Sequence, residues 1–250
     1  MTIRASELHV QDIVFGKLED STYITSQRVA VISHKQPKNK LLIQTPDIIT
    51  ETYGIPRDGP YYPNKKTRSF YKLPFCHERH EHASELDYAA IEKFYNKLRE
   101  VDMHCNSEAF RIQMFGEKNA NRYEYQPLVR MPDEADEDTV VDGKTYYRPP
   151  YTKIRLDLAY DTEKPLFRLF DKSEGIRMQE VKLETFDDIL QHMRYKTRLR
   201  MVIQFARVYA MKTAAGHEKK KYGIILKAFA VECTNKPQRL KGDGEDMFID

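Results

Sequence analysis

The sequence predicts an α+β, mainly β fold in which most strands pair antiparallel. Three features lead to this prediction: many short apolar stretches bounded by turn residues, a long helical pattern that occurs once, and two long alternating stretches near the C-terminal end. Hydrophobic residues make up 40% and aromatic residues 11% of the 250 residues, enough to form a core. This composition argues against intrinsic disorder.

The first part of the chain predicts a meander of short strands. Apolar residues gather at 12–15, 29–33 and 41–45, and turn-forming residues at 36–40 separate the second stretch from the third. Between residues 54 and 67, two Gly and three Pro predict an exposed loop, and a strand is expected at 69–75.

One long inserted helix is predicted at about residues 84–103. Apolar residues recur there at the three- and four-residue spacing of a single helical face: Leu86, Ala90, Ile91, Phe94, Leu98 and Val101. Ser84 is suited to the N-cap, and acidic residues come early and basic residues late, as the helix dipole favours.

The region from residue 119 to 150 has no recognisable period and is interpreted as a long loop. It contains four prolines and an acidic loop at about residues 132–143. Loops of this length are usually functional or disordered.

The C-terminal half predicts further strands and a short second helix. Ile154, Leu156, Leu158 and Tyr160 alternate with Lys153, Arg155, Asp157 and Ala159 within 153–160, so one face of that strand should be buried and the other exposed. Strands are also expected at 166–171 and 178–182, and Thr185 is suited to cap a helix at 186–193. The stretches 197–211 and 222–233 predict a long hairpin.

The predicted organisation is one domain at residues 1–235 followed by a flexible acidic tail at 236–250. No apolar stretch approaches the roughly 18–20 residues that cross a bilayer, so no membrane association is expected. The three cysteines do not form a disulfide framework, which favours a reducing, intracellular compartment.

Charge is segregated along the chain although the net charge is only +3. Cations alternate with aromatic residues in three groups, the composition that single-stranded nucleic acid requires, because cations follow the phosphates and flat rings stack on bases. The candidate binding residues are Tyr61, Tyr62, Lys65, Lys66, Arg68, Tyr71, Tyr146, Tyr147, Arg148, Lys153, Arg155, Arg194, Lys196, Arg198 and Arg200. Solvated charged loops and ordinary surface or core tyrosines are the alternative interpretation.

Residues that would support catalysis or a cofactor are not recognisable. Cys76, His80 and His82 are candidate metal ligands, but their spacing matches neither paired C-x-x-C motifs nor H-E-x-x-H. Glycine-rich phosphate-binding motifs and a nucleophile elbow are also missing from the sequence. We therefore expect neither enzymatic activity, nor a cofactor, nor a bound metal. A metal-dependent nuclease remains the enzymatic alternative.

Four segments resemble the OB-fold single-stranded DNA-binding proteins of nucleocytoplasmic large DNA viruses. They are 41–46 with 53–55, 69–75 with the helix that carries Phe94 and Leu98, 149–156 with 166–171, and 200–209 with 222–227. The resemblance is a spaced pattern across most of residues 41–233. It implies an OB-like antiparallel barrel that binds single strands without sequence preference. The chain has no Trp, and residues 205–209 occupy the hairpin position where some relatives would carry one.

The predicted function is sequence-nonspecific binding of single-stranded DNA, or RNA, during viral DNA replication, recombination or repair. The tail residues Asp243, Glu245, Asp246, Phe248 and Asp250 are similar to acidic tails that recruit replication or recombination proteins. A virus factory in the host cytoplasm, the nucleus and the virion are the expected locations. The alternative function is a non-catalytic structural or internal virion protein that docks other viral proteins.

Overall fold

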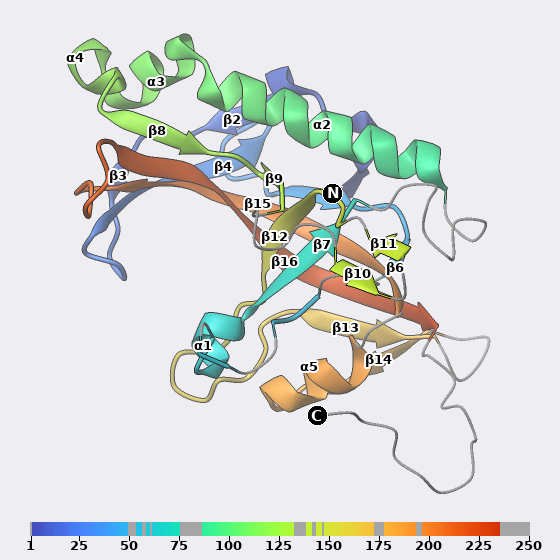
Figure 1. Ribbon diagram of the computed structural model, residues 1–250. Coiled ribbons are helices and arrows are strands. Elements are labelled where there is room, and N and C mark those ends of the chain that lie inside the picture. The colour runs from blue at the N-terminus through green and yellow to red at the C-terminus, as the bar shows by residue number, and fades with distance from the viewer. Residues whose placement is uncertain are drawn as a thin grey trace, which may run out of the picture.

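The computed structural model describes residues 2–49, 54–56, 59–60, 62–75, 87–132, 139–141, 144–146, 148–172, 178–193 and 197–235. Strands predominate over helices, and the main sheet curls into a half-barrel (Figure 1). The helices are α1 (Lys65–Arg68), α2 (Tyr88–Asn106), α3 (Glu108–Phe115), α4 (Glu117–Ala120) and α5 (Phe186–His192), with 3-10 turns at Ala5–Glu7 and Val10–Asp12. The strands are β1 (Thr2–Arg4), β2 (Ile13–Phe15), β3 (Glu19–Asp20), β4 (Gln27–His34), β5 (Leu41–Gln44), β6 (Ile48–Ile49), β7 (Phe70–Pro74), β8 (Tyr123–Gln126), β9 (Val129–Arg130), β10 (Thr139–Val141), β11 (Lys144–Tyr146), β12 (Tyr151–Arg155), β13 (Arg168–Asp171), β14 (Gln179–Val181), β15 (Arg198–Met211) and β16 (Lys220–Asn235).

The long hairpin of β15 and β16 is the centre of the sheet and confirms the sequence prediction. Residues such as Met201, Ile203 and Phe205 alternate with half-buried neighbours along β15, as expected for a strand with one face in the core. Register shifts interrupt the pairing between Val202 and Ile203 and between Phe205 and Arg207. Such irregularities bend strands and increase their twist, which is consistent with the curled sheet.

The sheet is mixed rather than antiparallel throughout. Its central order is β1-β5-β15-β16-β12-β7, and β16 pairs in parallel with β8, β12 and β13 on its other edge. The prediction of antiparallel pairing alone was therefore wrong in part. Strand direction depends on which distant segments meet, and local alternation of side chains does not report it.

Helix α2 covers one face of the sheet (Figure 1). Its buried residues are Ile91, Phe94, Leu98, Val101 and Cys105, so the predicted helical face is confirmed. The side chain of Asp87 accepts a hydrogen bond from the Ala90 amide and caps the helix. The predicted cap, Ser84, lies outside the described residues.

Two expectations about the middle of the chain were wrong. The helix is followed by α3 and α4, and the predicted loop at 119–150 contains β8, β9 and the hairpin of β10 and β11. The eight residues of α3 bury only Phe110 and Phe115, too few to produce a clear period. Strand β8 has four residues, and its Tyr123 and Tyr125 are buried although tyrosine is common on surfaces. Residues 133–138 and 142–143 of the acidic segment lie outside the described part.

The remaining strand predictions are confirmed with small shifts of their ends, except that the strand expected at 153–160 ends at Arg155, so residues 156–160 do not belong to it. The strands expected at 12–15, 29–33, 41–45, 69–75, 153–160, 166–171 and 178–182 correspond to β2, β4, β5, β7, β12, β13 and β14. Thr185 caps α5 as expected, because its hydroxyl accepts a hydrogen bond from the Asp188 amide. The loop expected at 54–67 includes the start of the short helix α1.

Candidate nucleic-acid interface

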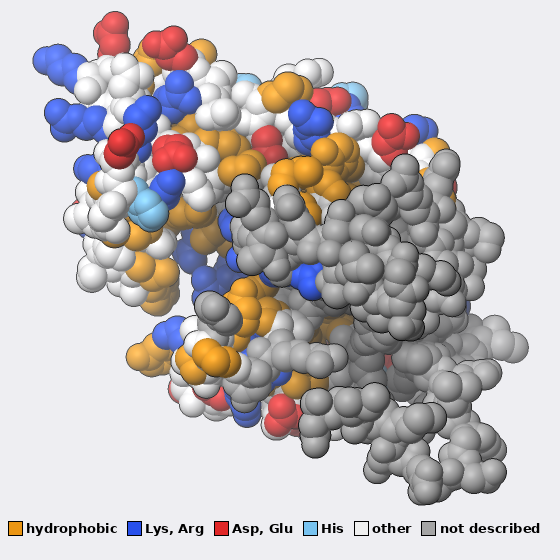
Figure 2. Space-filling view, in the orientation of Figure 1, with side chains coloured by type: hydrophobic (Ala, Val, Ile, Leu, Met, Phe, Trp, Pro, Cys, Tyr) orange, Lys and Arg blue, Asp and Glu red, His pale blue; other side chains and the backbone are white. Residues whose placement is uncertain are grey.

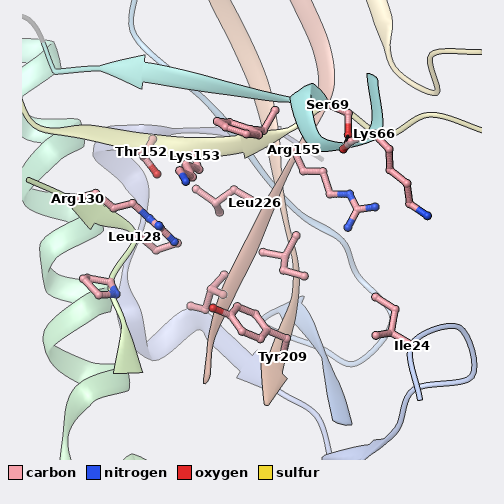
Figure 3. Close-up of a pocket in the computed structure, with 14 residues that line it drawn as sticks. Ile24, Lys66, Ser69, Leu128, Arg130, Thr152, Lys153, Arg155, Tyr209 and Leu226 are labelled. Carbon is pink, nitrogen blue, oxygen red and sulfur yellow. Dashed lines mark hydrogen bonds between the residues drawn. The ribbon is translucent and has the colours of Figure 1, made fainter. Parts of the chain in front are cut away.

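An open groove of about 420 Å³ lies between the β15–β16 hairpin, the β7–β12 pair and the β8–β9 corner. Figure 2 shows a hollow with Lys and Arg side chains in it, between the upper part of the molecule and the lower part that contains α1 and α5. Figure 3 shows the lining side chains, which are Ile24, Lys66, Ser69, Phe70, Pro127, Leu128, Arg130, Thr152, Lys153, Arg155, Tyr209, Ile224, Ile225 and Leu226.

The alternation of β12 places two of its cations at this groove. Ile154 and Leu156 are fully buried, whereas Lys153 is half-buried and Arg155 is exposed. This confirms the predicted buried face as far as Leu156. The same alternation places Tyr160 on that face, and this was wrong: strand β12 ends at Arg155, Leu158 is half-buried and Tyr160 is 95% exposed. Strand β7 pairs with β12 so that Phe70 lies opposite Arg155, and both residues belong to the groove lining.

The other two cations of the groove come from separate elements. Lys66 lies on α1. Asn64 caps this helix, because its side chain accepts a hydrogen bond from the Thr67 amide. Arg130 is the last residue of β9, which pairs with the start of β12. Lys66, Arg130, Lys153 and Arg155 therefore converge from three segments of the chain.

The β8–β9 corner is held by a buried carboxylate on α2. Asp102 accepts hydrogen bonds from the Tyr125 hydroxyl at 2.8 Å and from the amides of Leu128 and Val129 at 2.7 and 3.0 Å. Burial raises the pKa of Asp102, although these hydrogen bonds and the Arg130 guanidinium oppose the rise. Asp102 thus fixes the backbone that presents Arg130 to the groove.

The groove lining is positively charged. Among its fourteen residues are four Lys or Arg and no Asp or Glu. An acid does lie nearby, because Asp157 pairs with Arg155 at 2.8 Å and also contacts Lys227. The described lining therefore keeps a cationic excess that attracts anions.

The wall formed by the hairpin is aromatic and apolar. Tyr209 of β15 lies opposite Gly223 of β16. A Cβ added at Gly223 would lie 2.9 Å from the Gln126 carbonyl oxygen and 3.2 Å from the Tyr209 ring. The glycine thus provides the space that this ring and β8 occupy. Burial raises the pKa of Tyr209, and Arg130 opposes the rise, so the phenol stays protonated at neutral pH.

A second aromatic group lies at Phe70. The Phe70 and Tyr62 rings pack edge to face with centroids 5.6 Å apart. The Lys153 Nζ atom lies 4.9 Å from the Phe70 centroid, within the range of a cation–π contact. Cations and flat rings are therefore adjacent here, as the interleaved sequence pattern predicts.

Three of the predicted binding residues line the groove, and several others lie elsewhere. Lys66, Lys153 and Arg155 are in the lining. Lys65 shares α1 with Lys66, and Arg148 lies half-buried just before β12. Arg68 has a structural role, because its Nε donates to the Pro56 carbonyl and its guanidinium lies 5.6 Å from the Phe186 ring centroid.

Two predicted cations at the start of β15 belong to an ion-pair network away from the groove lining. Arg198 contacts Asp47 at 2.8 Å, and Arg200 contacts Glu232 at 2.7 Å and Asp47 at 4.0 Å. Two acids thus offset the charge of these two arginines, as Asp157 does for Arg155 in the groove. Arg198 and Arg200 are weaker candidates for phosphate binding because they also lie outside the groove lining.

Tyr71 was predicted to stack on bases, and this prediction was wrong. Its side chain is fully buried, as are those of Leu73 and Phe75 on the same face of the segment. The two-residue spacing of Tyr71, Leu73 and Phe75 in the sequence already indicated that all three side chains share the buried face. The same alternation could have identified Phe70, which is half-buried, as the aromatic residue on the opposite face of the strand.

Other predictions fall on residues that the structure does not describe. The side chain of Tyr146 is among them, although its backbone belongs to β11. The remainder are Tyr61, Tyr147, Arg194, Lys196, the possible metal ligands Cys76, His80 and His82, and the tail residues Asp243, Glu245, Asp246, Phe248 and Asp250. Within the described part of the chain, no group of three or more His, Cys, Asp or Glu is arranged to hold a metal ion.

Sequence reasoning missed Arg130 and Tyr209. Arg130 ends a two-residue strand inside a region that was interpreted as a loop, and only the pairing of that strand with β12 places it at the groove. Tyr209 lies beyond the irregularity between Phe205 and Arg207, so the alternation of the first half of β15 does not predict its face. A tyrosine opposite a glycine on the neighbouring strand indicates where the ring lies, but the sequence reveals this pairing only when the strand register is known.

Comparisons with known proteins give one informative similarity. No family model matches the chain. The chain is 27% identical over 217 residues to an uncharacterized protein of Acanthamoeba polyphaga mimivirus, a match that covers 78% of this chain. The match covers 51% of the mimivirus protein, so the chain spans about half the length of that relative. Among the described residues, no helix is long and apolar enough to cross a membrane.

Proposed function

We propose that this chain is a sequence-nonspecific single-stranded DNA-binding protein that acts without catalysis in viral DNA replication, recombination or repair. The observation that carries the proposal is the groove, where the described lining residues include four cations and no acids and form an aromatic and apolar wall. Cations bind phosphates of any sequence, and rings stack on any base, so this combination favours binding without sequence preference.

The arrangement of the groove suits a strand with exposed bases. In Figure 3, Arg130 and Lys153 lie on one side of Leu226, and Arg155 and Lys66 lie on the other. Two phosphates of one strand could occupy these two positions while a base or sugar contacts Tyr209 and the apolar wall. A volume of about 420 Å³ lies within the roughly 300–1,000 Å³ typical of sites for small organic groups.

We also propose that the curled sheet is a variant of the OB-type barrel. The support is a curved sheet with a helix inserted between strands β7 and β8, together with the cations and aromatic side chains that line the groove. The OB fold is a five-stranded, partly open Greek-key barrel, whereas the main sheet found here has 14 strands of mixed direction.

The viral setting of this proposal draws support from the similarity to the mimivirus protein. The proposed partners are single-stranded DNA, with RNA as the alternative strand, and replication or recombination proteins that bind the acidic tail. A host cytoplasmic virus factory, the nucleus and the virion are the proposed locations.

The test is fluorescence anisotropy with labelled oligo-dT, single-stranded RNA and duplex DNA of equal length, with and without magnesium. We expect single-stranded DNA to bind much more tightly than duplex, to remain intact, and to dissociate as salt is raised. Absence of binding at low salt would refute the proposal and favour a structural virion protein. Magnesium-dependent cleavage would favour a nuclease.

A further inference from the structure

Two tyrosine rings stand almost entirely in solvent. Tyr23 is 91% exposed and Tyr160 is 95% exposed, whereas the next most exposed aromatic side chain in the described residues, Phe229, is 40% exposed. A ring in water gains none of the stabilisation that burial provides. Packing within this chain therefore does not explain why these two positions carry rings.

Tyr23 is presented by an ordered turn between β3 and β4. The Ile24 amide donates to the Ser21 hydroxyl at 3.1 Å, and the Gln27 amide donates to the Ile24 carbonyl at 3.0 Å. The Ser21 amide also donates to the Gln27 carbonyl at 3.1 Å, which closes the turn. These bonds fix the backbone and leave the ring of Tyr23 outside it.

Tyr160 is presented by a comparable turn between β12 and β13. A bridge between Leu158 and Pro165 closes the turn at its base. The Ala159 amide donates to the Lys164 carbonyl at 2.8 Å, and the Glu163 amide donates to the Ala159 carbonyl at 2.9 Å. Both rings thus project from backbone that is hydrogen-bonded in place.

The two turns flank the groove. Ile24, next to Tyr23, lines the groove on the side of the β3–β4 turn (Figure 3). Lys66 also lines the groove, and its Nζ lies 5.6 Å from the centroid of the Tyr160 ring. In Figure 1 the blue β3–β4 turn and the gold segment before β13 lie on the same side of the molecule, and the hollow of Figure 2 lies between them.

We infer that Tyr23 and Tyr160 are base-stacking residues at the two rims of the groove. This inference rests on the proposed function and extends it by separating two tasks. The groove cations neutralise phosphates, which single strands and duplexes share, whereas the rim rings require bases whose faces are free. Preference for an unpaired strand therefore comes from the rims. The cation near Tyr160 belongs to the groove lining, so one strand can contact both.

The experiment compares two ligands of equal length and charge, an oligo-dT strand and the same strand with abasic positions. The variants are Tyr23→Leu, Tyr160→Leu and the double variant, with Tyr23→Phe/Tyr160→Phe as the conservative counterpart. Met103→Ala, a change at a 64% exposed side chain of α2, controls for loss of exposed apolar surface. Thermal unfolding verifies that each variant is folded.

Stacking of one base on one ring is worth roughly 1–3 kcal/mol, which corresponds to about fivefold or more in affinity. We expect each leucine variant to bind oligo-dT at least about fivefold more weakly and the double variant about 25-fold more weakly. Binding of the abasic strand and the salt slope should stay unchanged, and the phenylalanine variant should behave like the unmodified protein.

The outcomes separate the two claims. If the unmodified protein does not bind oligo-dT, the proposed function fails. If it binds and the double leucine variant binds equally well, the groove proposal stands and the stacking inference is refuted. An equal loss on dT and abasic strands also refutes the inference, because stacking needs a base. Retained DNA binding together with loss of a protein partner would assign the rings to protein contact instead.

Discussion

Neutralising two of the four groove cations should reduce the salt dependence of DNA binding by half. The variant is Arg130→Gln/Lys153→Gln, which removes the two cations on one side of Leu226 (Figure 3). Glutamine keeps much of the side-chain length and polarity, so the lost charge is the main change.

The magnitude follows from the number of cations in the groove. On a single strand, each phosphate contact contributes about −0.7 to the slope of log K against log salt. Four contacts therefore give a slope near −2.8, or a loss of about 50-fold in affinity between about 50 and 200 mM salt. Two contacts give a slope near −1.4 and a loss of about sevenfold.

The assay is anisotropy titration of labelled oligo-dT at four or more salt concentrations. Lys97→Gln/Arg99→Gln is the matched control, because it removes one Lys and one Arg from α2, outside the groove lining. We expect the control to keep the slope of the unmodified protein. If both double variants lower the slope equally, net charge and not the groove determines binding, and the assignment of phosphate contacts is wrong.

Three further predictions concern buried groups. Asp102→Asn should lower the free energy of unfolding by about 1–3 kcal/mol, because an amide replaces an acceptor of backbone N–H groups. Burial raises the pKa of Asp102 in the folded protein above its ordinary value of 3.8. The contribution of Asp102 to the free energy of unfolding is therefore complete below pH 3.8 and declines as the pH rises through the raised pKa. Urea unfolding should show that the difference in free energy of unfolding between the unmodified protein and the Asp102→Asn variant becomes smaller as the pH rises. A difference that grows with pH would contradict the raised pKa of Asp102. Gly223→Ala should lower the free energy of unfolding by about 1–3 kcal/mol, since the added methyl overlaps backbone; unchanged thermal unfolding would refute this crowding. Burial raises the pKa of Cys105 to about 12, so in a Cys76→Ser variant the buried Cys105 and Cys233 should react with a thiol reagent only after unfolding, and rapid labelling of the folded protein would disprove their burial.

Local periodicity predicted most of the regular elements. The helical face of α2, the cap of α5 and the alternation of Ile154 and Leu156 depend on residues close in sequence, and the structure confirms all three. Tyr71 belongs to this class too, because its alternation with Leu73 already indicates a buried side chain. Tyr71 was wrongly assigned because it lies in a group of cations and tyrosines, and that local composition was given more weight than its two-residue spacing from Leu73.

The candidate site depended on contacts between distant segments. The position of Lys153 on the face opposite Ile154 was predictable, but Arg130 reaches the groove through the pairing of β9 with β12 and the Asp102 hydrogen bonds. Tyr209 lies at the groove because of a register irregularity and because Gly223 lies opposite it.

The sequence by itself determined where most strands and the long helix form and which of their faces are buried. Those properties follow from side-chain spacing within one segment, since a strand repeats every two residues and a helix every 3.6. Only the tertiary structure decided which cations share a groove and which are ion-paired elsewhere, as Arg198 is with Asp47. The register and curvature of a sheet result from packing the whole chain, so no single segment encodes them.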